Sequence, residues 1–341
     1  MCRRTHEREL IPIVTMKPID PALAQAARNV VERCLGIQAG EVVSIITDSA
    51  DPDRIAIARA FWEEARSKGA DVILAEMLPR KTSGEEPPAP IAQLMAESNV
   101  VLCPTTKSLS HTKARRIASA RGARIASLPT VTKEMAVRCL TADYGNVAVL
   151  TQRVAEKLSR GSKFKVESEL GTSLELERQD RTVDADTGLL TQRGDFGNLP
   201  AGEAFFAPVE GTANGKIVFD GSVADLGILA EPIEIQVEGG IARIVSTCAA
   251  AQQLERNLAA HGPDAYNIAE LGVGTNDRAI VSGYILEDEK VLGTVHIALG
   301  NNAGMGGTVN VSIHLDGLIR NATLYVDGEL VLDKGKLLIS P

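Results

Sequence analysis

Four side chains of the kinds that bind divalent metals occur close together near the end of the sequence: Glu270, His296, His314 and Asp316. They lie in the glycine-containing segments AELGVGTN, TVHIALGNN and SIHLDG. His314 and Asp316 are two positions apart, and on a β-strand this spacing places both side chains on one face, where they can share an ion. We therefore predict a metal site suited to hydrolytic or oxidative chemistry.

The alternative is that these residues are ordinary core residues. A histidine in an apolar run, such as His296, is more often a hydrogen-bonded core residue than a ligand, because one or two partners satisfy an imidazole. A cluster is different, since several buried polar groups are costly unless something pairs them, and a cation does so directly. Glu203 follows a Pro-Ala-Gly turn and enters an apolar strand, which makes it a candidate for a further ligand; the alternative is a solvent-facing glutamate at the mouth of the strand. Glu210 is predicted to be a surface or turn residue.

Other segments indicate how a substrate is held. AELGVGTN lacks the third glycine of a dinucleotide fingerprint and no Walker lysine follows, so its glycines are expected to let the backbone approach the metal centre. The loop NNAGMGG, which begins at Asn301, is predicted to contact the substrate. His111, at the start of a predicted helix, is a second candidate for substrate binding; the alternative is a helix cap or a surface histidine. No G-x-S-x-G nucleophile elbow is present.

The elements that must position these residues fall into two predicted domains. Residues 21–160 alternate apolar strands with helical segments, which is typical of an α/β domain with a parallel sheet. Residues 161–341 read as strands and tight turns with one helix, which predicts a mostly antiparallel β-rich (α+β) domain that carries the metal ligands. Residues 1–20 are predicted to be a disordered leader, with Met16 as an alternative start.

Composition excludes several classes of function. The net charge is −8 and the aromatic residues are six Phe, four Tyr and one Trp, so we expect no nucleic-acid partner. No apolar run is long enough for a signal peptide or a membrane span, so we expect no membrane partner. The five cysteines are scattered without a CxxC pair, which predicts reduced thiols and a cytoplasmic location.

The second domain resembles the aminopeptidase T/S family of dinuclear metalloaminopeptidases, through LPAGEAFFAP, ELGVGTN, DEKVLGTVHIALG and SIHLD in the family's order. The first domain resembles it more loosely, through SLSHTKARRIASARGARIASLP. The resemblance implies a homodimer that hydrolyses an amide of a small peptide with water activated by two divalent metals, Zn, Co or Mn. Glu270 or Glu289 would accept the proton from water. The implied metal ligands are Glu203, Glu270, His296, His314 and Asp316.

One position departs from that family. The longer aminopeptidases have a tyrosine seven residues after the first histidine, and here that position is Ala303. The sequence also resembles ring-cleaving dioxygenases of the 2,5-dihydroxypyridine type, which hold Fe(II) with two histidines and an aspartate; Glu270 stands where their other histidine is placed. A mononuclear Fe(II) dioxygenase acting on a small molecule is therefore the first alternative. A non-catalytic protein that binds a metal or a small molecule is the second.

Overall fold

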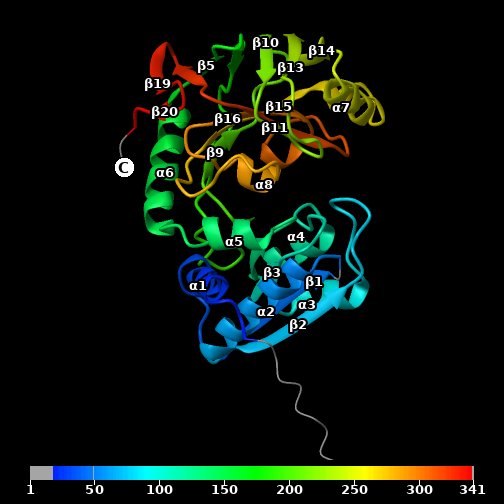
Figure 1. The fold of residues 1–341 in the computed structure, drawn as a ribbon, viewed down its shortest axis with the longest axis vertical. Helices are drawn as coiled ribbons and strands as arrows, with labels where there is room; N and C mark the ends of the chain where they lie inside the picture. Colours follow the sequence, from blue (N-terminus) through cyan, green and yellow to red (C-terminus); the bar gives the residue numbers. More distant parts are fainter. Residues whose placement is uncertain (1–17, 49, 340–341) are drawn as a thin grey trace, which may run out of the picture.

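The computed structural model describes residues 18–48 and 50–339. Figure 1 shows two halves, an α/β half below and a β-rich half above, joined along one side by the helix α6 (Tyr144–Arg160). Within the described residues the strands form one parallel sheet of five strands and two further sheets of seven and eight. The predicted fold class is confirmed. Most of the predicted leader, including Met16, lies outside the described residues.

The α/β half is built on the parallel sheet, in the order β2-β1-β3-β4-β8, with every neighbouring pair parallel. Its strands are β1 (Val42–Asp48), β2 (Asp71–Met77), β3 (Val100–Cys103), β4 (Arg124–Ser127) and β8 (Phe196–Asn198). The helices are α1 (Pro21–Asn29), continued by the π-helical turn η1 (Val30–Cys34), α2 (Pro52–Ser67), α3 (Ala89–Ala96), α4 (Lys113–Ala120) and α5 (Lys133–Cys139).

Local sequence explains where these helices begin. Asp51 caps α2 by accepting a hydrogen bond from the backbone N–H of Asp53, and Pro52 supplies a first helical residue that needs no donor. Asp143 caps α6 in the same way, accepting from Gly145 and Asn146. The long helix between the two halves therefore has a defined start.

One strand crosses the expected domain boundary. β8 lies beyond residue 161, yet it pairs with β4 at the edge of the parallel sheet, with Ile125 opposite Phe196. The chain thus leaves the α/β half through α6, begins the β-rich half, and returns once before continuing. A division at residues 160 and 161 therefore does not separate the two structural halves cleanly.

The β-rich half contains two sheets. The inner sheet, on the side of the α/β half (Figure 1), consists of β12 (Gly227–Ile228), β11 (Ser222–Val223), β17 (His314–Ile319), β16 (Val295–Gly300), β15 (Ile268–Gly274), β9 (Glu203–Phe206) and β7 (Asp184–Asp186), in that order. The outer sheet consists of β14 (Ile241–Ile244), β13 (Ile233–Glu238), β10 (Asn214–Phe219), β6 (Ser173–Glu177), β5 (Lys163–Glu167), β18 (Thr323–Val326), β19 (Glu329–Asp333) and β20 (Lys336–Leu337).

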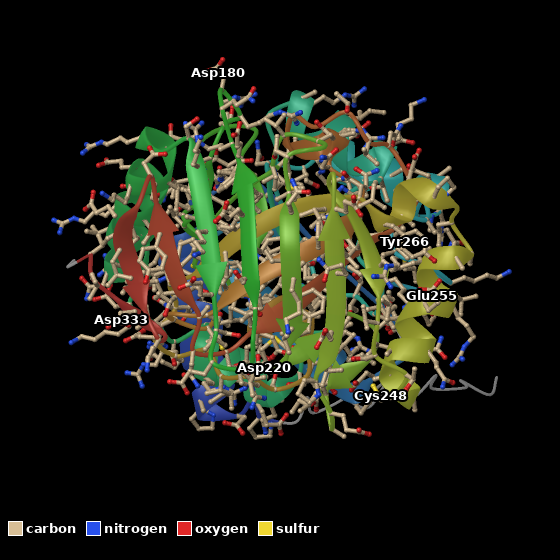
Figure 2. All side chains as sticks on the ribbon, turned by 90° about the horizontal axis from the view of Figure 1, so that it is seen from above. Asp180, Asp220, Cys248, Glu255, Tyr266 and Asp333 are labelled. Atoms are coloured by element: carbon tan, nitrogen blue, oxygen red, sulfur yellow. The ribbon has the colours of Figure 1, made fainter. Side chains whose placement is uncertain are left out.

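A single apolar core joins these two sheets, with Phe164 and Phe206 in ring contact at 4.6 Å between their centroids. The helix α7 (Ala249–Ala259) lies along the β14 edge of the outer sheet, as Figure 2 shows from above. Short helices, η2 (Pro263–Tyr266), α8 (Ile285–Asp288) and η3 (Ala303–Met305), lie in the connections. One face of the inner sheet packs on this apolar core. The other face, which is turned toward the α/β half, carries polar residues.

Two further features concern the described part of the chain. No helix among those residues is both long and apolar enough to cross a membrane. The cysteines described there, Cys34, Cys103, Cys139 and Cys248, are not paired in disulfides.

Candidate metal centre

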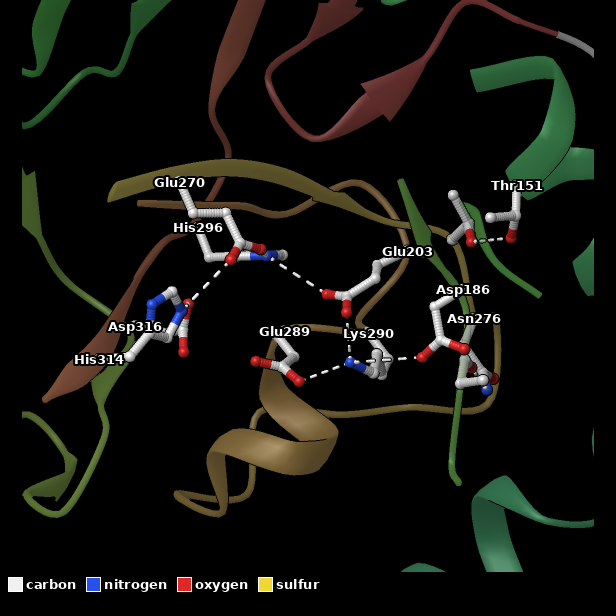
Figure 3. A network of polar contacts seen from close by, with 12 residues as sticks. Thr151, Asp186, Glu203, Glu270, Asn276, Glu289, Lys290, His296, His314 and Asp316 are labelled. Atoms are coloured by element: carbon white, nitrogen blue, oxygen red, sulfur yellow. Dashed lines mark hydrogen bonds and ion pairs between the residues drawn. The ribbon is translucent and has the colours of Figure 1, made fainter. Parts of the chain in front are cut away.

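Neighbouring strands of the inner sheet bring the predicted ligands together. Glu270 lies on β15, His296 on β16, and His314 and Asp316 on β17, while Glu203 begins β9 on the other side of β15. Figure 3 shows the five side chains gathered on one side of these strands. The structure therefore places the five residues in one cluster; their role as metal ligands remains a prediction.

The glycines of β15 make room for this cluster. Gly272 lies directly opposite His296 in the β15–β16 register. A Cβ atom at Gly272 would lie 2.0 Å from Nε2 of His296, so no larger residue fits without displacing the ring. Gly274 lies opposite Glu203, and a Cβ there would lie 2.1 Å from the carbonyl oxygen of Val291. The two glycines therefore allow the backbone of β15 to approach its neighbours closely, as predicted from the segment AELGVGTN.

Glu270 is the centre of the cluster. Its Oε1 lies 3.3 Å from Nε2 of His296, and its Oε2 lies 3.2 Å from Nε2 of His314. On one side His296 Nε2 also lies 3.3 Å from Oε2 of Glu203, and on the other His314 Nε2 lies 3.5 Å from Oδ1 of Asp316. Two sets of three donors result, Glu203 with Glu270 and His296, and Glu270 with His314 and Asp316, each set within 4.8 Å.

The hydrogen bond of His314 indicates which set fits a metal better. Nδ1 of His314 lies 2.8 Å from the carbonyl oxygen of Asn301, and since a carbonyl only accepts, Nδ1 carries the proton. Metal-binding histidines commonly donate their second nitrogen in this way. When the ring is neutral, its unprotonated Nε2 faces two carboxylates, so either a metal cation or a second proton on the ring must lie between them. The donor set of Glu270, His314 and Asp316 is therefore compatible with a divalent metal.

Some buried polar atoms of the cluster lack a well-formed hydrogen bond. Among the described residues, Glu203 Oε2, His296 Nδ1 and Asp316 Oδ1 are buried without a hydrogen-bond partner. A buried polar atom without a partner is costly, and three of them in one cluster are unusual in a folded chain. A cation beside these carboxylates would remove part of that cost.

Without a metal, the imidazoles must supply the positive charge themselves. Burial lowers the pKa of His296, but the hydrogen bond to Glu270 and the charge of Glu203 raise it more, to about 9. Burial likewise lowers the pKa of His314, and the adjacent Asp316 and Glu270 raise it well above its ordinary value. Burial raises the pKa of Glu270, but hydrogen bonds from both histidines lower it more, to about 2. Metal binding would have to displace a proton from the site.

A buried lysine forms a second charged group beside the first. The Lys290 side chain is fully buried, and its Nζ lies 2.6 Å from Glu203 Oε1, 2.5 Å from Glu289 Oε1 and 3.9 Å from Asp186 Oδ2 (Figure 3). Burial raises the pKa of Asp186 to about 7, with Lys290 lowering it and Glu203 raising it. Burial also raises the pKa of Glu289 well above its ordinary value.

Sequence reasoning missed Lys290 and Asp186. In EDEKVLG a lysine among acidic residues is typical of a solvated surface, and nothing local indicates that it is buried. Asp186 lies in DADTG, which reads as a turn. Only the pairing of β7 with β9, where Asp186 lies opposite Glu203, brings these groups together.

The predicted substrate-binding residues have different surroundings. His111 lies in the loop between β3 and α4 with its side chain partly accessible to solvent; the surrounding protein lowers its pKa, and the charges of His314, Arg115 and Arg116 lower it further. Asn301 uses its amide within its own loop, where Nδ2 donates to Val311 O and Oδ1 accepts from the N–H of Ala303. Its contact with substrate remains a prediction. Ala303 itself is exposed.

Comparison with known proteins identifies relatives of this fold. The model of the family described as 2,5-dihydroxypyridine 5,6-dioxygenase matches residues 22–339. Among solved structures, 2,5-dihydroxypyridine dioxygenase from Pseudomonas putida KT2440 is similar with 20% identity and a TM-score of 0.79, over 95% of this chain and 99% of that one. Wild-type AmpT from Thermus thermophilus is similar with 16% identity and a TM-score of 0.68, over 93% and 99%. No curated protein matches.

Proposed function

This chain belongs to the 2,5-dihydroxypyridine 5,6-dioxygenase family, and from that premise we propose that it is a metal-dependent dioxygenase that opens a hydroxylated aromatic ring. The family match over residues 22–339 is the observation that carries the proposal. A dihydroxypyridine or a closely related dihydroxylated ring is the proposed substrate.

The family match corrects the main functional prediction made from the sequence. Two-metal amide hydrolysis by an aminopeptidase is wrong, because the family model that spans the chain is that of a dioxygenase. The likeness to AmpT, at 16% identity, concerns the fold alone. Glu270 and Glu289, predicted to accept a proton from water in that hydrolysis, lose that role with it. That the protein works as a homodimer remains a prediction.

The proposed metal ligands are Glu270, His314 and Asp316. Carboxylate oxygens and an imidazole nitrogen suit Fe(II), and the bond from His314 Nδ1 to Asn301 presents Nε2 as the ligand atom. A bound Fe(II) would relay electrons from the ring to O₂, so that the ring itself is oxidised and no external reductant is needed. The set has one histidine and two carboxylates, whereas the usual non-haem iron triad has two histidines and one carboxylate. Metal identity is therefore part of the test.

The remaining residues are proposed to bind and orient the ring. The cluster lies on the face of the inner sheet toward the α/β half (Figure 1), and His111 lies in the loop after β3. Loops that follow the carboxyl ends of parallel strands are the usual ligand-binding side of such a sheet. Burial lowers the pKa of His111, and its neutral imidazole would accept a proton from a ring hydroxyl.

The test is ring opening by protein of known metal content. Purified protein is stripped with chelator, loaded anaerobically with Fe(II), Mn(II) or Zn(II), and given 2,5-dihydroxypyridine in air-saturated buffer. We expect the Fe(II) protein to consume one O₂ per ring, measured with an oxygen electrode and by loss of the ring's absorbance. The Zn(II) protein, which has no redox chemistry, is the matched control.

Two outcomes decide the proposal. Oxygen uptake with dihydroxylated rings that depends on Fe(II) would support it. Fully Fe(II)-loaded protein that consumes no O₂ with any dihydroxylated pyridine or benzene would overturn it.

A further inference from the structure

The loop between β16 and β17 connects the strand of His296 to the strand of His314. It begins at Asn301, whose N–H donates to Ile313 O at 2.8 Å, so the two ends of the loop are held side by side. The carbonyl of the same Asn301 accepts the hydrogen bond from His314 Nδ1 at 2.8 Å. Any shift of the start of this loop therefore acts directly on the His314 ring.

Asn302 is the residue on which the loop folds. Its side chain is fully buried, Nδ2 donates to Glu210 Oε1 at 2.9 Å, and Oδ1 accepts from the N–H of Val309 at 2.9 Å. Gly307 packs against this amide so closely that a Cβ there would lie 2.0 Å from Asn302 Cγ. The loop is therefore compact, although several of its other residues are exposed.

Two charged residues from outside the loop hold it in place. Glu210, in the turn after β9, also accepts the N–H of Thr308 at 2.7 Å through Oε1. Arg181, between β6 and β7, pairs with Oε2 of Glu210 through Nη2 and donates from Nη1 to the carbonyl of Gly306 at 2.6 Å. Their side chains are only 16% (Arg181) and 23% (Glu210) exposed, so this ion pair is shielded from water. Glu210 is therefore more than the surface or turn residue predicted from the sequence.

We propose that the Glu210–Arg181 pair positions the metal centre: by anchoring the loop through Asn302, Thr308 and Gly306, it holds the Asn301 carbonyl where it orients His314. Glu210 and Arg181 are positioning residues in this proposal, since neither touches the cluster. The proposal deepens the proposed function and rests on the same ligand set of Glu270, His314 and Asp316.

The expected change in metal affinity can be estimated from other metal sites. Groups that orient a ligand without touching the metal typically change metal affinity by about 10–100-fold when removed. Here the orienting group is a backbone carbonyl, which cannot be deleted by substitution. The side chains that hold its loop are therefore the accessible way to disturb it.

The experiment compares Glu210→Gln and Arg181→Met with the wild type and with Glu169→Gln. Glu169 forms an exposed ion pair with Lys334, so its substitution removes a similar charge pair far from the loop. Mn(II) affinity is measured by isothermal titration calorimetry, and the visible absorption spectrum of Co(II)-loaded protein reports the coordination sphere. We expect Mn(II) Kd to rise about 10–100-fold in both loop variants, with an altered Co(II) spectrum, and no change in Glu169→Gln.

Unchanged Co(II) spectra and Mn(II) Kd values within threefold of the wild type in both variants would overturn the proposal. If either variant fails to fold, Glu210→Asp and Arg181→Lys, which keep the ion pair but alter its reach, are compared in the same way. Restoration toward wild-type affinity when Lys replaces Met at position 181 supports the charge pair as the cause. Wild-type protein that binds Mn(II) but opens no ring when loaded with Fe(II) would overturn the proposed function and leave this proposal standing.

Discussion

Lys290 Nζ lies 2.6 Å from Oε1 of Glu203 in a pair where the lysine is fully buried and the glutamate nearly so. Burial lowers the pKa of Lys290, but Glu203 and Glu289 raise it far more, so the ammonium stays charged. One oxygen of Glu203 is thus committed to an internal cation, while the other faces His296. This relationship separates Glu203 from the proposed ligand set of Glu270, His314 and Asp316 and gives the acidic cluster a fixed positive charge.

Lys290→Met should destabilise the fold strongly. Removing one partner of a buried ion pair leaves uncompensated charge and costs about 3–5 kcal/mol, and here Glu203 and Glu289 both lose their partner. Urea unfolding followed by circular dichroism measures the loss. Lys334→Met, at an exposed lysine, is the matched control, and its free energy of unfolding should equal that of the wild type. A Lys290→Met protein as stable as that control would mean that another cationic group compensates the negative charge of Glu203 and Glu289.

His314→Ala should remove metal binding while the α/β half stays folded, because that half has its own apolar core. Metal per chain, measured by mass spectrometry after dialysis, should fall to background, and oxygen consumption with it. Far-UV circular dichroism should be unchanged. Lys334→Met, at an exposed lysine that contacts neither the cluster nor the loop between β16 and β17, is the control. Full metal occupancy in His314→Ala would remove this histidine from the site.

Gly272→Ala should damage the centre without adding or removing charge. The new Cβ would meet His296 Nε2 at 2.0 Å, so the ring must move away from Glu203 and Glu270. Overpacking of this kind typically costs about 1–3 kcal/mol. We expect a lower melting temperature and weaker Mn(II) binding. Gly211→Ala, where a Cβ meets no atom within 4 Å, is a partial control, since its positive φ of 83° adds backbone strain. If Gly272→Ala keeps the melting temperature and metal affinity of the wild type, the His296 ring can move aside without cost.

The contribution of Glu210 to stability should depend on pH. Burial raises its pKa, but hydrogen bonds from Thr308, Asn302 and Arg181 lower it more, to about 2, against an ordinary value of 4.5. A carboxyl whose folded pKa is depressed contributes stability that is present above its unfolded pKa and is lost as pH falls through the folded one. The stability difference between wild type and Glu210→Gln should therefore be full at pH 6 and shrink between about pH 4.5 and pH 2. Urea titrations at several pH values measure it, and a constant difference would contradict this account.

Sequence alone determined the architecture and the members of the cluster. The alternation of apolar strands with helices from β1 to β4 reflects local periodicity, and caps such as Asp51 and Asp143 act within a few residues, so both can be read without a structure. His314 and Asp316 share a strand face because the side-chain period of a strand is two.

How the clustered side chains pair and which charges surround them depends on contacts between distant parts of the chain. Lys290 meets Glu203 across 87 residues of chain, and Glu210 reaches Asn302 across 92, so neither contact leaves a local trace in the sequence. The place of β8 in the parallel sheet is not visible in the local sequence either, because it depends on the free edge beside β4. Long-range register between strands sets these contacts, and that register depends on packing of the whole core rather than on neighbouring residues.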